Sequence, residues 1–262
     1  MPEKFFDRII FLLSQYGTSY LYGAYRTIVI ALAGTFFGCV IGFIIGVIQA
    51  IPISQNDRYA KKSLLKIIRD ILTVYVEFFR GTPMIVQAMF IYYGAMQLLN
   101  FDMSIWFAGI FIVSINTGAY MAETVRGGIS SIDSGQTDGA KAIGMNHSQT
   151  MTYVIIPQAL RNILPQIGNN LIINIKDSSV LSVISVTELF FTGKSVSGVY
   201  YTYFESMFIV CIIYLIITVS CSLLLRLLEK RMDGAKTYDL ATKDTLAHTS
   251  GMTRFIRRND RH

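Results

Sequence analysis

Residues 135–145 read Gly-Gln-Thr-Asp-Gly-Ala-Lys-Ala-Ile-Gly-Met, and residues 153–165 read Tyr-Val-Ile-Ile-Pro-Gln-Ala-Leu-Arg-Asn-Ile-Leu-Pro. This polar stretch carries helix start and stop signals, yet it lies between long hydrophobic runs. A connection between packed helices is normally short. A long connection with its own helix signals therefore favours a structure that docks a partner.

The start and stop signals divide the stretch into two short helices. Asp138 is expected in the first turn of an alanine-rich helix, where a carboxylate stabilises the positive end of the helix dipole. Gly144 stands where a helix ends on a left-handed residue. Asn146 and Gln149 have the spacing of a capping box, and Pro157 is expected to end the second helix. Two helices joined by a glycine turn form either a rigid docking knob or an ordinary ordered loop.

The composition is that of an integral membrane protein with a single polytopic domain. Hydrophobic residues make up 52% of the 262 residues, only 15% are charged, and the mean hydropathy is +0.47. A soluble domain carries about a quarter charged residues. The net charge of +6 requires no nucleic-acid partner, because the basic residues gather in the predicted loops and tail, as the positive-inside rule expects.

The sequence predicts an all-α membrane fold with about five spanning helices, since a crossing needs roughly 20 mostly apolar residues. Four of them cover about residues 25–51, 105–125, 163–186 and 204–228. The other lies in the apolar run that ends at residue 99 and is interrupted at Gly81-Thr82-Pro83. The distribution of Lys and Arg predicts an external amino terminus and a cytoplasmic carboxyl terminus in a multi-pass protein of the cell membrane.

We divide the chain into three parts. Residues 3–13 alternate charged and apolar pairs, so residues 1–18 are expected to form an amphipathic helix that lies in the membrane interface. Residues 19–231 form the transmembrane domain and include the loop at 135–157. Residues 232–262 form a polar cytoplasmic tail, expected to be mobile. An irregular connection is expected over 187–203.

Glycine recurs at every fourth position in the first span, and such small-residue stripes let another helix approach closely. The four positions are Gly34, Gly38, Gly42 and Gly46.

The residues that could carry catalysis or bind a metal are scattered. The three Cys lie inside apolar runs without ligand spacing, and the three His lie in different segments. We therefore expect no catalytic residue, no metal and no cofactor. The sequence also lacks the Gly-x-x-x-x-Gly-Lys-Ser/Thr loop that binds nucleotide phosphates.

The break at Gly81-Thr82-Pro83 predicts half of a polar path across the membrane. Gly81 is expected to permit a turn, Thr82 to cap a new helix, and Pro83 to be its first residue. Such a half-helix aims free backbone N–H groups at a substrate carboxylate. A simple kink or interfacial bend is the alternative.

The fourth span predicts the other half. Gln166, Asn170, Asn174 and Asp177 follow spacings of four, four and three, so they share one helix face. Polar groups in a membrane are costly unless they line a cavity or meet a partner. The face either lines the path, with Asp177 attracting an ammonium group, or bonds to other helices across a dimer interface. Pairing of Asp177 with Lys176 is a further alternative.

Several motifs in order resemble a known family. Asp138-Gly139-Ala140, Gly144 and residues 154–157 (Val-Ile-Ile-Pro) are similar to the EAA motif, with Asp for Glu, Gly for Ala and Ile for Leu as departures. Residues 77–83 (Glu-Phe-Phe-Arg-Gly-Thr-Pro), 119–128 (beginning Ala-Tyr-Met-Ala-Glu) and 176–180 (Lys-Asp-Ser-Ser-Val) match further. The chain resembles the permease subunits of ABC importers of polar amino acids, which have the type I importer fold, over about residues 23–231.

The resemblance implies an assembly of several proteins. A second permease subunit, identical or similar, would form the membrane core, with two ATP-binding subunits in the cytoplasm and an extracellular solute-binding protein. The loop at 135–157 would be the coupling helix that seats on the ATPase, and ATP hydrolysis would belong to that partner. The coupling residues are Asp138, Gly139, Ala140, Ala142, Gly144, Met145 and Pro157.

The acidic residues bear on substrate and on rival functions. Asp177 lies beside amides, which favours a neutral polar amino acid as the substrate. Two further acid–base pairs at i,i+3 spacing, Glu77 with Arg80 and Glu123 with Arg126, are expected to be structural ion pairs. An ion-coupled secondary transporter without an ATPase is the alternative, although it would normally show repeats and no docking loop. A membrane-embedded hydrolase would need a nucleophile–base pair or metal ligands within the spans.

Overall fold

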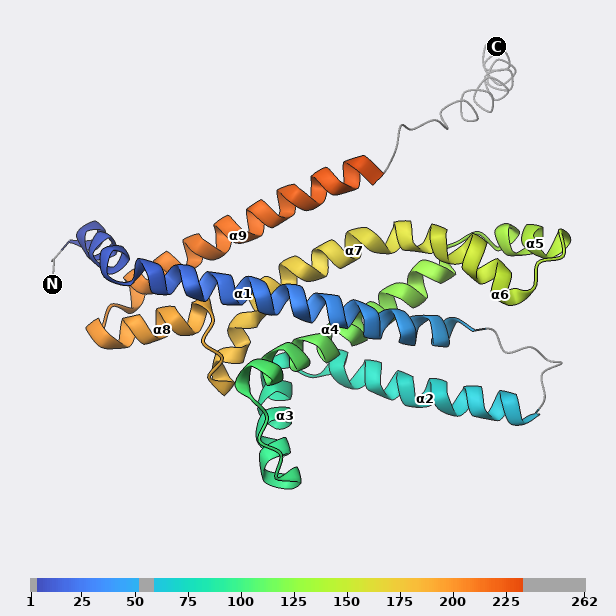
Figure 1. Ribbon diagram of the computed structural model, residues 1–262, viewed down its shortest axis with the longest axis horizontal. Helices are drawn as coiled ribbons and strands as arrows, with labels where there is room; N and C mark the ends of the chain where they lie inside the picture. The colour runs from blue at the N-terminus through green and yellow to red at the C-terminus, as the bar shows by residue number, and fades with distance from the viewer. Residues whose placement is uncertain (1–3, 52–58, 233–262) are drawn as a thin grey trace, which may run out of the picture. The chain divides into compact units, whose positions relative to one another are not determined.

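The structure, a computed structural model, describes residues 4–51 and 59–232, and every regular element within them is helical (Figure 1). The α-helices are α1 (Phe5–Ala50), α2 (Tyr59–Gly81), α3 (Met84–Leu99), α4 (Ile105–Ser130), α5 (Ser134–Ala142), α6 (His147–Thr150), α7 (Ile156–Asp177), α8 (Leu189–Tyr200) and α9 (Tyr203–Met232). A π-helical turn, Met151–Ile155, and a 3₁₀ segment, Ser178–Ile184, flank α7.

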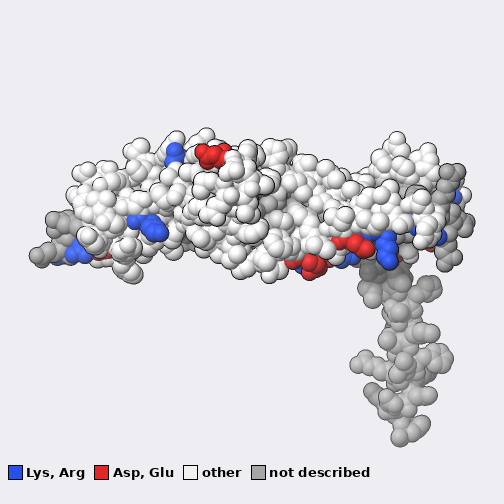
Figure 2. Space-filling view, turned by 90° about the horizontal axis from the view of Figure 1, so that it is seen from below, with Lys and Arg blue, Asp and Glu red and all other residues white. Residues whose placement is uncertain are grey.

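The helices agree roughly with the predicted five spans. Within the described residues α1, α4 and α9 are each long and apolar enough to cross a membrane. The helical run His147–Ile184 and α8 pass the same test together as a pair bent by 53°. The remaining predicted span corresponds to α2 and the short apolar helix α3. Charged residues along α2 lower its hydropathy. On the face drawn in Figure 2, charged side chains form a few isolated groups on an otherwise uncharged surface.

The glycine stripe of α1 packs against α4 (Figure 1), as the sequence predicted. A Cβ added at Gly34 would lie 2.3 Å from Val113, and one added at Gly42 would lie 2.3 Å from Met121. Gly38 and Gly46 meet α4 in the same way. The missing side chains therefore let the two backbones approach closely.

A helix replaces the irregular connection that was expected over 187–203. Glu188 caps α8, because its carboxylate accepts hydrogen bonds from the backbone N–H groups of Phe190 at 2.8 Å and Phe191 at 2.7 Å. The Tyr214 hydroxyl donates to the same carboxylate at 2.8 Å. A buried acid that satisfies a helix terminus stabilises α8 and joins it to α9.

The two ends of the chain differ in what the structure describes. Residues 5–18 are helical and continuous with the first span, and Arg8 bonds to Glu205 at 2.9 Å. The chain divides into two compact units at Ser222, and the described part of the second is the end of α9. Apart from Met232, the predicted tail at 232–262 lies outside the described residues.

Pro157 does not end the second loop helix, so that prediction is wrong. The chain runs from α6 through the π-helical turn into α7 without leaving helical structure. Pro157 falls in the first turn of α7. A proline is tolerated there because the missing N–H lies at a helix start. The helix of the fourth span consequently begins at Ile156 and contains Pro165 in its interior.

Candidate functional site

A cavity of about 300 Å³, which we call the polar cavity, lies between the α2–α3 break, α4 and α7. Its polar lining consists of Thr82, Asn116, Thr117, Tyr120, Asn170, Asn174 and Asp177. Four of the six residues predicted for a substrate path therefore meet in one cavity. The other two, Gly81 and Gln166, are absent from its lining.

The break beside the cavity forms at the predicted place but with different contacts. α2 ends at Gly81, and Pro83, not Thr82, is the N-cap residue of α3. The Thr82 hydroxyl instead donates to the carbonyl oxygen of Phe78 at 2.8 Å. The predicted cap is therefore wrong, because a hydroxyl that bonds four residues back closes α2 instead of starting α3.

Gln87, which the sequence did not single out, holds the break together. Its amide nitrogen lies 2.9 Å from the carbonyl oxygens of Phe79 and Thr82 and 2.8 Å from the Thr82 hydroxyl. Its Oε1 accepts from Nδ2 of Asn116 at 2.9 Å. A single Gln in an apolar helix carries no spacing signal, so its bridging role between α2 and α4 emerges only from the packing.

These bonds fix the orientation of Asn116 at the cavity wall. Its Nδ2 is used by Gln87 and, at 3.4 Å, by the carbonyl oxygen of Phe79. Its Oδ1 has no hydrogen-bond partner within the described residues. An amide oxygen is an acceptor only, so Asn116, which lines the cavity, has an unused acceptor.

The two asparagines of α7 in the cavity lining bond to neighbouring groups of the protein, as in the alternative in which the polar face joins helices. The bonds lie within one chain and not across a dimer. Nδ2 of Asn174 lies 2.8 Å from the Thr35 hydroxyl and 2.9 Å from the Thr117 hydroxyl, which joins α7 to α1 and α4. Asn170 donates to the carbonyl oxygen of Gln166 in its own helix at 2.9 Å and to Sδ of Met121 on α4 at 3.4 Å. Their donors are thus already used inside the protein.

Asp177 differs from its neighbours on α7. It is the last residue of that helix and the one charged residue in the cavity lining. Within the described residues its carboxylate forms no ion pair with Lys176 and no hydrogen bond. The described His, Cys, Asp and Glu residues also form no group of three that could hold a metal ion. The free groups of the cavity are mainly acceptors, which suits an ammonium group.

The predicted coupling loop has the expected helices with one correction. Asp133 is the N-cap of α5 and accepts from the backbone N–H of Gly135 at 2.6 Å. Asp138 lies in the second turn, 3.6 Å from the Lys141 ammonium, so its expected first-turn position is wrong. Ala140 is buried, whereas Asp138, Gly139, Ala142, Gly144 and Pro157 are exposed and Met145 is half-buried.

The turn between the loop helices is confirmed. Gly144 has a φ of +86° and is the one described glycine with a positive φ. Gly81 therefore does not have the left-handed conformation that only glycine adopts easily, and the α2–α3 break does not require a glycine there. Asn146 and Gln149 form both bonds of the capping box, each at 2.9 Å.

Two large side chains that were not predicted as coupling residues stand out on this loop. Ile143 is 76% exposed and Tyr153 is 71% exposed. They flank the glycine turn and the start of α7.

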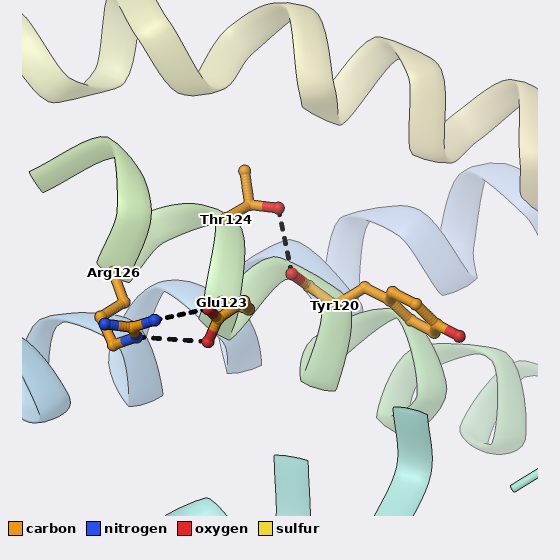
Figure 3. A network of polar contacts seen from close by, with 4 residues as sticks. All are labelled: Tyr120, Glu123, Thr124 and Arg126. Carbon is orange, nitrogen blue, oxygen red and sulfur yellow. Dashed lines mark hydrogen bonds and ion pairs between the residues drawn. The ribbon is translucent and has the colours of Figure 1, made fainter. Parts of the chain in front are cut away.

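A charged group lies at the end of α4 (Figure 3). Nε of Arg126 bonds to Glu123 at 3.2 Å, which confirms one of the two expected ion pairs. Glu77 and Arg80 form no such pair within the described residues. Cζ of Arg80 instead lies 5.9 Å from the centroid of the Tyr120 ring. The Tyr120 side chain points away from Glu123 and Arg126 in Figure 3.

Comparisons with known proteins identify the family of the chain. Residues 42–234 match the family described as binding-protein-dependent transport system inner membrane components. The glutamine transport system permease protein GlnP of Escherichia coli is 38% identical over 212 residues, which cover 80% of this chain and 91% of that protein. The putative glutamine transport system permease protein GlnP of Rickettsia typhi is 31% identical over 230 residues, covering 87% and 96%.

Solved structures show the same fold. The structure of an amino acid ABC transporter with histidines is 34% identical, has a TM-score of 0.76 and covers 88% of this chain and 100% of that one. An inward-facing structure of the MetNI methionine ABC transporter is 19% identical with a TM-score of 0.67 and supports the fold alone. The chain is thus a transport component and not an enzyme, and it belongs to the family of binding-protein-dependent transport system inner membrane components, as a permease of the type I ABC importers of amino acids.

Proposed function

We propose that this chain forms the pathway through which an ATP-driven importer moves a polar amino acid into the cell. The observation that carries the proposal is the polar cavity, with the unpaired carboxylate of Asp177 and the free Oδ1 of Asn116 in its wall. Both groups accept hydrogen bonds from an ammonium group, which every free amino acid carries. One carboxylate among amides favours a neutral polar side chain, and two relatives named for glutamine transport support that choice.

The substrate carboxylate would lie at the opposite end of the cavity. The first N–H groups of α3 have no partner within the helix and carry its positive dipole end. Met84, the first residue of α3, lines the cavity. Thr82 contributes indirectly, because its bonds to Phe78 and Gln87 hold the break that starts α3 in place.

The loop at 135–157 would transmit ATP hydrolysis to this pathway. Two short helices set by Gly144 and the Asn146 capping box make a rigid unit. The exposed Ile143 and Tyr153 offer apolar contacts to a groove on the ATPase. Two ATP-binding subunits, a second permease subunit and an extracellular solute-binding protein complete the proposed assembly.

The proposed orientation follows from the basic residues. The amino terminus is external and the carboxyl terminus cytoplasmic, which places the coupling loop beside the ATPase. Residues 1–18 would lie along the outer interface, and residues 232–262 would form a cytoplasmic tail.

Reconstitution tests this function directly. The chain, its ATPase and its binding protein are placed in proteoliposomes, and ATP hydrolysis is measured with each of the twenty amino acids. We expect one polar amino acid, or a small group of them, to stimulate hydrolysis and to accumulate. Accumulation by this chain alone without ATP would instead support the ion-coupled alternative.

A further inference from the structure

A second cavity, of about 330 Å³, lies between the end of α1, the second half of α2 and the end of α4. Its charged lining residues are Arg69, Glu77, Arg80, Glu123 and Arg126, and we call it the arginine cavity. The proposed pathway through the polar cavity makes no use of these charges.

The spacing of residues on α2 builds one wall of the arginine cavity. Arg69, Thr73, Glu77 and Arg80 follow one another at intervals of four, four and three, so they lie on one helix face. A polar face on a helix of a membrane protein needs water, a protein partner or a ligand.

The charges in this cavity do not all pair with one another. Arg126 is bonded to Glu123 (Figure 3), so that pair is satisfied. Arg69 and Glu77 form no ion pair within the described residues. Nε of Arg69 is buried and has no hydrogen-bond partner among the residues that the structure describes. A buried donor without an acceptor is destabilising, and an anionic ligand would supply the acceptor.

The arginine cavity adjoins the polar cavity at Tyr120. Tyr120 lines the polar cavity, and its ring lies 5.9 Å from Cζ of Arg80, which lines the arginine cavity. The aromatic face attracts the guanidinium and leaves its N–H groups available. Arg80 and Tyr120 therefore connect the linings of the two cavities.

We propose that the arginine cavity is a second binding site for the transported amino acid, occupied before release into the cytoplasm. Arg69 and Arg80 bind the α-carboxylate, because guanidinium groups pair with carboxylates through two parallel hydrogen bonds. Glu77 accepts from the α-ammonium. Recognition through these two charges does not depend on the side chain, so any free α-amino acid is a ligand. The site rests on the proposed function, since it receives substrate that has passed the polar cavity.

Equilibrium dialysis of tritiated L-glutamine tests the site. The permease–ATPase complex is held in phosphatidylcholine nanodiscs without the binding protein. We expect two glutamines per permease chain, and one after either Asp177→Asn or Arg69→Gln. Removing one charged contact weakens its site by about tenfold or more. Glu77→Gln gives the same loss with a neutral side chain of equal size, should Arg69→Gln fail to assemble.

Lys66→Gln is the matched control, because Lys66 is exposed on α2 one turn before Arg69. It should retain two glutamines. One glutamine per wild-type chain, or two per Arg69→Gln chain, would overturn the second site. ATP-dependent uptake is measured in parallel, so that a failure of the proposed function is seen separately as missing uptake.

A lipid phosphate is the other anion that could reach the arginine cavity. Repeating the dialysis in phosphatidylglycerol nanodiscs distinguishes it from the amino acid. The second glutamine should persist there. Its displacement by the anionic lipid would assign the cavity to a lipid headgroup and overturn the proposal.

Discussion

Asn174 and Asp177 stand three residues apart on α7 and differ in what they contact. The Asn174 amide is buried and bonded to two threonines on α1 and α4, whereas the Asp177 carboxylate is unpaired within the described residues. A shared helix face thus holds one residue that positions helices and one that is free to meet a ligand.

Substituting Asp177 and Asn174 separately tests whether the two residues have these different roles. Asp177→Asn should abolish stimulation of ATP hydrolysis by substrate, because a charged hydrogen bond of about 1.5–3 kcal/mol is lost. The complex should still assemble. Asn174→Leu should instead lower the amount of assembled complex, since two buried hydroxyls lose their partner. Size-exclusion chromatography and ATPase assays measure both, and failure of Asp177→Asn to assemble would make its role structural.

Gln87 supports a second prediction at this scale. Gln87→Leu removes the bonds of the Gln87 amide to the carbonyl oxygens of Phe79 and Thr82 and to the Asn116 amide, at a cost of about 1–3 kcal/mol. We expect a lower melting temperature in detergent and weaker transport. Gln97→Leu, at an exposed position of the same helix, should melt like the wild type. Equal melting of the two variants would show that Gln87 does not hold the break.

Among the elements, the loop at 135–157 depends most on one backbone conformation. Gly144→Val places a β-branched residue at a φ of +86°, which is strained. Uptake and ATPase assembly should both fall, while the protein still inserts. Gly127→Ala on α4, outside the loop at 135–157, is the control, because nothing lies within 4 Å of its added Cβ. Normal ATP-coupled uptake by Gly144→Val would count against docking through this loop.

The α1–α4 contact makes an independent prediction for the elements. At Gly42 an added Cβ would meet the backbone of α4, with the Ala122 nitrogen at 2.8 Å. Gly42→Ala should therefore destabilise the protein by about 1–3 kcal/mol, as overpacking does. Gly17→Ala on the same helix meets nothing within 4 Å and should be neutral or stabilising. Thermal inactivation of the two variants compares them.

For the whole molecule, the membrane orientation remains a prediction from the basic residues. In a chain whose Cys39, Cys211 and Cys221 are replaced by alanine, Asp102→Cys should react with an impermeant maleimide from outside intact cells. Ser148→Cys should react only after the cells are opened. The reverse pattern would invert the proposed topology. Asp102 and Ser148 are both exposed, so either thiol is accessible to the reagent.

The sequence by itself determined the features that depend on neighbouring residues: the apolar spans, the glycine stripe, the turn at Gly144 and its capping box. The tertiary structure decided which polar groups stay free. Thr35 and Asn174 are 139 residues apart, and Gln87 and Asn116 are 29 apart. Their bonds exist only because α1, α3, α4 and α7 pack together, and no local pattern records that packing. Helix periodicity could therefore place Asp177 on a polar face, but only the packed helices left its carboxylate without a partner.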